Sequence, residues 1–221
     1  MAGVFPALAA MLAIPAVPAF GACPESRICC HCYWNDICGD CTVSSLPQLD
    51  RYCEHPFYGG FTSGSYDLVT GHVRSSAFGW FDGDNSGLLV AVDEFTIHDA
   101  QGSGPVTLHL RLSVYLDESC TVHASLAHQG AKVEYSKTNL TGQIVSFEDS
   151  LELEIEVTPG IPFTVEYALG SQGIFPRAAQ VDGHLKFKSV NAVTVESCQG
   201  YGSSPVPGGR TTWGAVKSLY R

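Results

Sequence analysis

Apolar and polar residues alternate strictly over several stretches of this chain. In the longest stretch, the residues between the apolar positions are Thr, His, Arg, Ser and Tyr. The six apolar residues are Val106, Leu108, Leu110, Leu112, Val114 and Leu116. A period of two over this length is typical of a β-strand with one buried face and one face in water. We therefore expect a long strand at the centre of a sheet, with these six side chains in the core.

The same alternation recurs later in the chain, at residues 151–157 and 163–169. Shorter candidate strands lie at 122–127, 131–135, 143–147, 185–187 and 193–195. Segments rich in Gly and Pro separate the strands, and no stretch has the spacing of a crossover helix. The pattern predicts an all-β fold in which two antiparallel sheets pack face to face, a jelly-roll or immunoglobulin-like β-sandwich over residues 57–198.

Residues 1–22 carry no charged side chain and consist mainly of Ala, Leu, Val, Ile and Pro. Such a run predicts a signal peptide, with cleavage after Ala19 or Gly21, and hence an exported protein that is secreted or held at the cell surface or envelope. The alternative is a retained transmembrane helix, which the three prolines and the absence of flanking charges disfavour.

Seven of the nine cysteines lie between Cys23 and Cys53. In a reducing compartment, Cys30 or Cys32 together with Cys38-Gly-Asp-Cys41 would suit a zinc site. Behind an export signal, oxidation competes with metal for these thiols, so we expect a disulfide-stapled knob over residues 23–56.

An odd number of cysteines requires one that is outside any intramolecular disulfide. The sequence Phe20-Gly21-Ala22-Cys23 is similar to a bacterial lipobox, so lipidation of Cys23 would attach the protein to a membrane and leave eight cysteines to pair. We expect Cys120 and Cys198 to be oxidised, most simply with each other. A bond from either one to the N-terminal knob is the alternative.

A segment starting at Asp82 resembles the calcium loop of an EF-hand. Oxygen ligands fall at the expected spacing, and the candidate calcium ligands are Asp82, Asp84, Ser86, Leu88 through its carbonyl, and Asp93. Val90 occupies a usually polar position, and the flanking residues read as strands rather than helices. The alternative is an ordinary hairpin turn rich in Asp, Gly and Asn.

Charge and motifs exclude several function classes. The net charge is −10 and no basic stripe is present, which argues against nucleic acid as a partner. The sequence contains no G-x-S-x-G elbow, no H-E-x-x-H and no phosphate-binding glycine loop. The outward row Glu152, Glu154 and Glu156 is expected to pair with basic residues across strands. No residue is assigned a catalytic role.

The segment Thr158-Pro-Gly-Ile-Pro-Phe163 enters a strand that ends at Leu169, and a second strand, Val181–Phe187, follows. This arrangement resembles the last strands of exported bacterial β-sandwich proteins of the envelope-sorted, PEP-CTERM-like kind. The chain departs from that family because no transmembrane helix follows Pro205-Val206-Pro207. The resemblance implies surface or secreted placement and implies no activity.

Residues 199–221 have the Gly, Ser and Pro content of a linker, followed by a short basic end. We expect a detachable tail that serves as a sorting signal or a membrane patch, with a disordered terminus as the alternative. The whole chain then reads as a non-catalytic exported module that binds an extracellular glycan or envelope component, or has a structural role in the envelope or matrix. A small secreted hydrolase acting on a glycan or polymer is the alternative.

Overall fold

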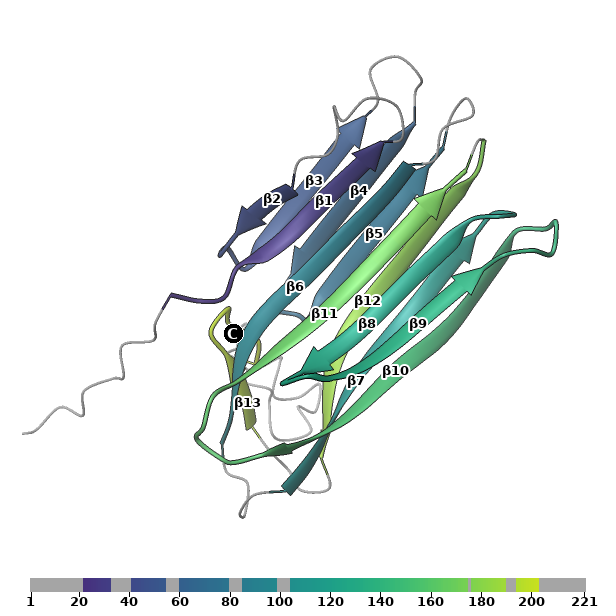
Figure 1. Cartoon of the computed structure of the whole chain (residues 1–221). Helices are drawn as coiled ribbons and strands as arrows, with labels where there is room; N and C mark the ends of the chain where they lie inside the picture. The colour runs from purple at the N-terminus through teal and green to yellow at the C-terminus, as the bar shows by residue number, and fades with distance from the viewer. Residues whose placement is uncertain are drawn as a thin grey trace, which may run out of the picture.

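The computed structural model describes residues 22–32, 41–54, 60–79, 85–98, 104–174, 176–189 and 194–202. These residues form strands and connecting turns, and the strands lie in two antiparallel sheets that pack face to face (Figure 1). The predicted all-β sandwich is confirmed. Within these ranges, no helix has the length and apolar character needed to cross a membrane.

Sheet A has the strand order β2-β1-β6-β11-β8-β9, with β13 paired to β6 beside this path. Its strands are β1 (Ser26–Cys32), β2 (Cys41–Ser44), β6 (Asn85–His98), β8 (Thr121–His128), β9 (Ala131–Thr138), β11 (Phe163–Gly173) and β13 (Thr194–Ser197). Sheet B has the order β10-β7-β12-β5-β4-β3. Its strands are β3 (Gln48–Glu54), β4 (Phe61–Asp67), β5 (His72–Phe78), β7 (Gly104–Leu116), β10 (Val145–Val157) and β12 (Ala178–Ser189).

Strand β7 carries the longest predicted apolar face and lies inside sheet B, between β10 and β12. Leu108, Leu110 and Leu112 are fully buried in the core between the sheets. The segments predicted as separate strands at 143–147 and 151–157 belong to one strand, β10, which pairs with β7 along its full length. The core therefore lies where the alternation predicts.

The cysteine-rich segment is part of the sandwich rather than a separate knob. Strand β1 pairs with β6 in sheet A, and β3 pairs with β4 in sheet B. Ile28 and Cys30 of β1 point inward and are each 1% exposed. The predicted boundary at residue 57 is wrong because the described strands before it complete both sheets.

Among the described residues, three disulfides join Cys23 to Cys198, Cys29 to Cys41, and Cys30 to Cys53. The predicted Cys120–Cys198 pair is wrong, and the alternative bond from Cys198 to the N-terminal segment is confirmed. Cys198 is bonded to Cys23 instead, and Cys120 lies as a buried thiol in the core between the sheets.

The bond at Cys23 also bears on lipidation. A thioether-linked lipid needs the same sulfur atom that is bonded to Cys198. The structure therefore disagrees with membrane attachment through Cys23. Because structural disulfides form and persist in oxidising compartments, the three bonds are those of a protein that matures in such an environment.

Candidate binding faces

Three aromatic side chains form a row on the outer face of sheet B, one from each of β3, β4 and β5. We call Tyr52, Phe61 and Phe78 the aromatic row. The ring centroids of Tyr52 and Phe61 are 5.5 Å apart and those of Phe61 and Phe78 are 5.6 Å apart, with interplanar angles of 29° and 25°. Tyr52 is 60% exposed. The antiparallel register places Phe61 opposite Phe78, and this pairing lines up the rings across the strands.

Polar side chains continue this face across β4, β5 and β12. The hydroxyl groups of Ser63 and Ser76 lie 2.6 Å apart on neighbouring strands. The side chain of Gln180 donates a hydrogen bond of 2.7 Å to Asp182. Arg74 donates to the same carboxylate at 2.5 Å. Hydrogen-bonding groups therefore lie next to an aromatic row in which Tyr52 is exposed and Phe61 and Phe78 are half-buried.

Beyond β12, the same face has a hollow of about 300 Å³ around Tyr115. The Tyr115 hydroxyl donates to Asp117 at 3.2 Å, and desolvation together with the Asp117 charge raises the pKa of this phenol. Tyr115 therefore stays a protonated donor at neutral pH. Tyr52 and Tyr115 are four strand spacings apart, which is about 19 Å across the sheet.

Two carboxylates, Glu148 and Asp182, line this hollow from β10 and β12. Paired carboxylates are the usual machinery of glycoside hydrolysis, so this is where the hydrolase alternative would have to operate. Glu148 is ion-paired with Arg111, and Asp182 with Arg74. These partners fit a structural role for both acids, and hydrolysis stays an untested alternative.

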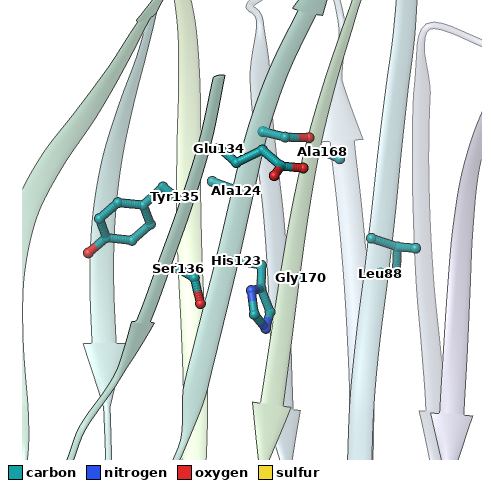
Figure 2. Close-up of a pocket in the computed structure, with 9 residues that line it drawn as sticks. Leu88, His123, Ala124, Glu134, Tyr135, Ser136, Ala168 and Gly170 are labelled. Atoms are coloured by element: carbon teal, nitrogen blue, oxygen red, sulfur yellow. The ribbon is translucent and has the colours of Figure 1, made fainter. Parts of the chain in front are cut away.

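The outer face of sheet A has its own hollow, of about 290 Å³, over strands β6, β11, β8 and β9 (Figure 2). Ala168 and Gly170 of β11 form its floor. We call this site the sheet-A hollow; its lining includes Leu88, His123, Ser125, Glu134, Ser136, Ala168 and Gly170. A second hollow, of about 440 Å³, lies further along β11 and is lined by Val92, Ala127, His128, Phe163 and Glu166 among others.

The predicted calcium loop does not form a single site. Ser86, Leu88 and Asp93 all lie in the continuous strand β6, where the outward face carries Ser86 and Leu88 and the inward face carries Asp93. Seven residues of strand separate Ser86 from Asp93 by about 23 Å, so they cannot share one cation. Asp82 and Asp84 lie outside the described residues, and calcium binding through them stays a prediction. Within the described ranges no group of three or more His, Cys, Asp or Glu residues could hold a metal ion.

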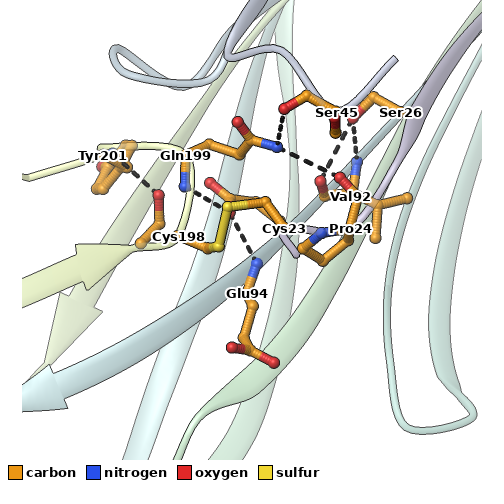
Figure 3. The surroundings of a disulfide bond; sticks show 11 residues. Cys23, Pro24, Ser26, Ser45, Val92, Glu94, Cys198, Gln199 and Tyr201 are labelled. Carbon is orange, nitrogen blue, oxygen red and sulfur yellow. Dashed lines mark hydrogen bonds between the residues drawn. A yellow bond between two sulfur atoms is a disulfide. The ribbon is translucent and has the colours of Figure 1, made fainter. Parts of the chain in front are cut away.

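Asp93 instead accepts a hydrogen bond from the backbone of Gln199, in a clasp where the two ends of the described chain meet. Figure 3 shows this clasp around the Cys23–Cys198 disulfide. Cys198 is bonded to Cys23, and the side-chain amide of Gln199 donates to the carbonyl oxygens of Pro24 at 3.3 Å and Ser45 at 3.0 Å. Gln199 is 6% exposed. The predicted tail therefore cannot begin at residue 199, and residues 203–221 lie outside the described part of the chain.

The carboxylate of Asp93 is fully buried in this clasp. Its Oδ1 accepts hydrogen bonds from the backbone N–H groups of Glu94 at 2.8 Å and Gln199 at 3.2 Å. Its Oδ2 accepts no hydrogen bond among the described residues. Desolvation raises the pKa of Asp93 to about 6, while hydrogen bonds from Ser197 and the two backbone N–H groups act in the opposite direction.

We expect Asp93→Asn to stabilise the protein at neutral pH. Because the pKa of Asp93 is raised on folding, its contribution to stability is complete below the unfolded value near 3.8 and is lost as the pH rises through about 6. Asn keeps an oxygen for the two N–H donors and carries no charge. Urea unfolding should show the variant more stable by up to about 3 kcal/mol at pH 7.5. At pH 4 the two proteins should differ much less, and a constant difference across this range would contradict the assignment.

Other predicted features have mixed outcomes. Glu152 pairs with Lys188 at 2.7 Å, so cross-strand pairing of the outward acids is confirmed for this residue. The sequence offered no signal for the aromatic row, because its three members are spread over residues 52–78 and come together only through the strand register.

No family model matches this chain, and no curated protein matches it. A carbohydrate-binding module, TmCBM61 in complex with β-1,4-galactotriose, is similar over 63% of this chain and 88% of its own, with 10% identity and a TM-score of 0.33. The enzymatically active domain of bacteriophage CBA120 tailspike protein 4 is similar over 64% of this chain and 19% of its own, with 10% identity and a TM-score of 0.32. The GH31 α-xylosidase from Xanthomonas citri is similar over 80% of this chain and 16% of its own, with 14% identity and a TM-score of 0.21. These scores are too low to assign a function.

Proposed function

We propose that the protein is an exported, non-catalytic module that binds neutral extracellular glycans through the outer face of sheet B. The observation that carries this proposal is the aromatic row, with Tyr52 60% exposed beside hydrogen-bonding side chains. A pyranose ring has an apolar face of C–H groups and an edge of hydroxyl groups. It therefore suits a surface where aromatic rings adjoin fixed polar groups.

The charge of the molecule favours a neutral ligand. The net charge is −10, and Asp50, Glu54 and Glu148 add carboxylates to this face. Arg74 and Arg111 are already ion-paired with Asp182 and Glu148. An anionic polysaccharide would meet repulsion here, whereas a neutral one would not. Placement in a bacterial envelope agrees with this function and stays a prediction.

Tyr52→Ala and Phe61→Ala should each weaken polysaccharide binding by tenfold or more. Each change removes an aromatic surface on which a sugar ring can stack, and exposed Tyr52 on an edge strand can be lost without damage to the core. Affinity electrophoresis through gels containing cellulose derivatives, xylan, mannan or galactan measures the effect. Leu140→Ala is the matched control, because Leu140 is 81% exposed in the loop between β9 and β10 and is not part of the aromatic row.

Two outcomes would overturn the proposal. One is that the wild-type protein migrates unchanged through every polysaccharide. The other is that it releases reducing ends from one of them and that Glu148→Gln or Asp182→Asn abolishes this release. The second result would establish the hydrolase alternative, since both acids line the hollow beside Tyr115.

A further inference from the structure

We infer that the sheet-A hollow is a second binding site for a sugar residue, so that one molecule holds two glycan chains on opposite faces and cross-links them. This inference rests on the proposed function and extends it from a binding module to a cross-linking one. It is carried by the shape of the hollow, by its hydrogen-bonding groups and by its position in the fold.

The hollow exists because β11 presents very small residues at its centre. Ala168 and Gly170 lie on the outer face of β11, and larger side chains stand on the two adjacent strands, Leu88 on β6 and His123 on β8. A Cβ atom at Gly170 would meet the Cβ of His123 at 3.5 Å and the backbone oxygen of Gly87 at 3.7 Å, both ordinary contact distances. Glycine is therefore not required for packing at this position, and its effect is to deepen the floor.

Three polar side chains around this floor have unused hydrogen-bonding capacity. In the described part of the chain, the ring of His123 and the hydroxyl groups of Ser125 and Ser136 make no side-chain hydrogen bond. The register places His123 directly opposite both Ser136 and Gly170. Glu134 is fixed by Lys132 at 2.5 Å and adds an acceptor at the rim. Donors and acceptors thus surround a small apolar floor.

This chemistry matches one sugar ring better than a protein segment. The volume of about 290 Å³ is close to the lower limit of ligand sites, about 300 Å³. Leu88, at 44% exposed, and Ala168 offer apolar contacts, while His123, Ser125, Glu134 and Ser136 offer polar groups around them. An amphipathic peptide would need a longer apolar groove. A pyranose needs a small apolar floor and several hydrogen bonds around it.

The two sites face in opposite directions. Figure 1 shows the two sheets packed face to face. The aromatic row lies on the outer face of sheet B and the hollow on the outer face of sheet A, with the core between them. Sheets in a sandwich pack about 10 Å apart, and the side chains of both outer faces add to this thickness. One extended glycan cannot lie on both faces without wrapping around the edge of the sandwich. Two separate glycan chains can each occupy one face, and each protein molecule then links the two glycans.

Isothermal titration with cellotetraose, xylotetraose, mannotetraose and galactotetraose tests the number of sites. The wild-type protein should bind two molecules of one of these tetrasaccharides. Ala168→Leu fills the hollow from an outward position, and His123→Ala with Ser136→Ala removes hydrogen bonds from its wall. Each of these variants should bind one tetrasaccharide, as should Tyr52→Ala. The matched control, Thr164→Leu, makes a similar change on β11 in the second hollow instead of the sheet-A hollow, and it should keep both sites.

A turbidity measurement tests whether the protein cross-links glycan chains. The wild-type protein should precipitate the corresponding polysaccharide, measured as turbidity, and neither Ala168→Leu nor Tyr52→Ala should do so. Suppose that the wild-type protein binds one tetrasaccharide, that Tyr52→Ala abolishes this binding and that Ala168→Leu leaves it unchanged. This result would overturn the second site while the proposed function stands. If Ala168→Leu abolishes tetrasaccharide binding and Tyr52→Ala leaves it unchanged, the proposed role of the aromatic row is overturned instead.

Discussion

Leu110→Asp should prevent the domain from folding. Leu110 is fully buried on β7, where the register places it beside Leu151 of β10 and Leu185 of β12. The substitution removes apolar burial and places a carboxylate among aliphatic side chains with no cation in reach. Loss of a buried Leu side chain alone costs about 2–5 kcal/mol, and an unpaired buried charge adds several more. The sum exceeds much of the stability of an ordinary domain, which is about 5–15 kcal/mol.

Thr107→Asp is the control for this prediction. Thr107 lies on the same strand but points outward, beside Lys188 of β12. The same charge there should leave the protein folded. Circular dichroism and the yield of soluble protein compare the two variants with Leu110→Ala, which should be folded but destabilised. A folded Leu110→Asp protein would contradict the placement of β7 in the core.

The strands that the sequence predicts are those whose buried side chains are large and aliphatic. Strand β7 and the second half of β10 show strict alternation because every second residue is Leu, Ile or Val. Strands β4 and β5 gave no such signal, since many of their inward positions hold small or polar residues such as Thr62, Gly64 and Ser75. A Cβ at Gly64 would lie 2.7 Å from Ile28 of the opposite sheet. Close approach of the two sheets therefore requires a residue that hydrophobic periodicity cannot detect.

Hydrophobic alternation does not predict the strands of the cysteine-rich segment, and the reason is different. A cysteine in a clustered segment is usually interpreted as a disulfide residue, and the apolar character of its side chain is then ignored. In β1, Cys30 fills the same role as Ile28, an inward core position, and is also bonded to Cys53 of sheet B. The disulfide and the strand pairing are not alternatives here, because one cysteine takes part in both.

The candidate sites depend on register, which the sequence does not contain. Tyr52, Phe61 and Phe78 are neighbours only because Phe61 is opposite Phe78 and diagonal to Tyr52. The sheet-A hollow likewise needs β8 and β9 to align His123 with Ser136. The calcium pattern shows how strand geometry separates residues that are close in sequence. Its spacing fits a loop in the sequence, but a strand spreads the same residues along its length and onto both faces.

Removal of the Cys23–Cys198 disulfide should produce the largest loss of stability of any change at the described cysteine pairs. The bond joins residues 175 apart in sequence, and it restricts nearly the whole unfolded chain. Chain-entropy arguments give a contribution of about 5 kcal/mol for a loop of this length. The double variant Cys23→Ser with Cys198→Ser should therefore unfold at a much lower urea concentration than the wild-type protein.

The pair Cys29 and Cys41 provides a matched control. This bond closes a loop of only 12 residues within the β1–β2 pair, so the same argument gives about 3 kcal/mol for its removal. Peptide mapping under non-reducing conditions should first confirm both bonds in the purified protein, and a lipid on Cys23 would be visible in the same spectra. If the Cys23–Cys198 variant proves no less stable than the Cys29–Cys41 variant, the hydrogen bonds of Gln199 to Pro24 and Ser45 hold the two ends of the chain without help from the disulfide.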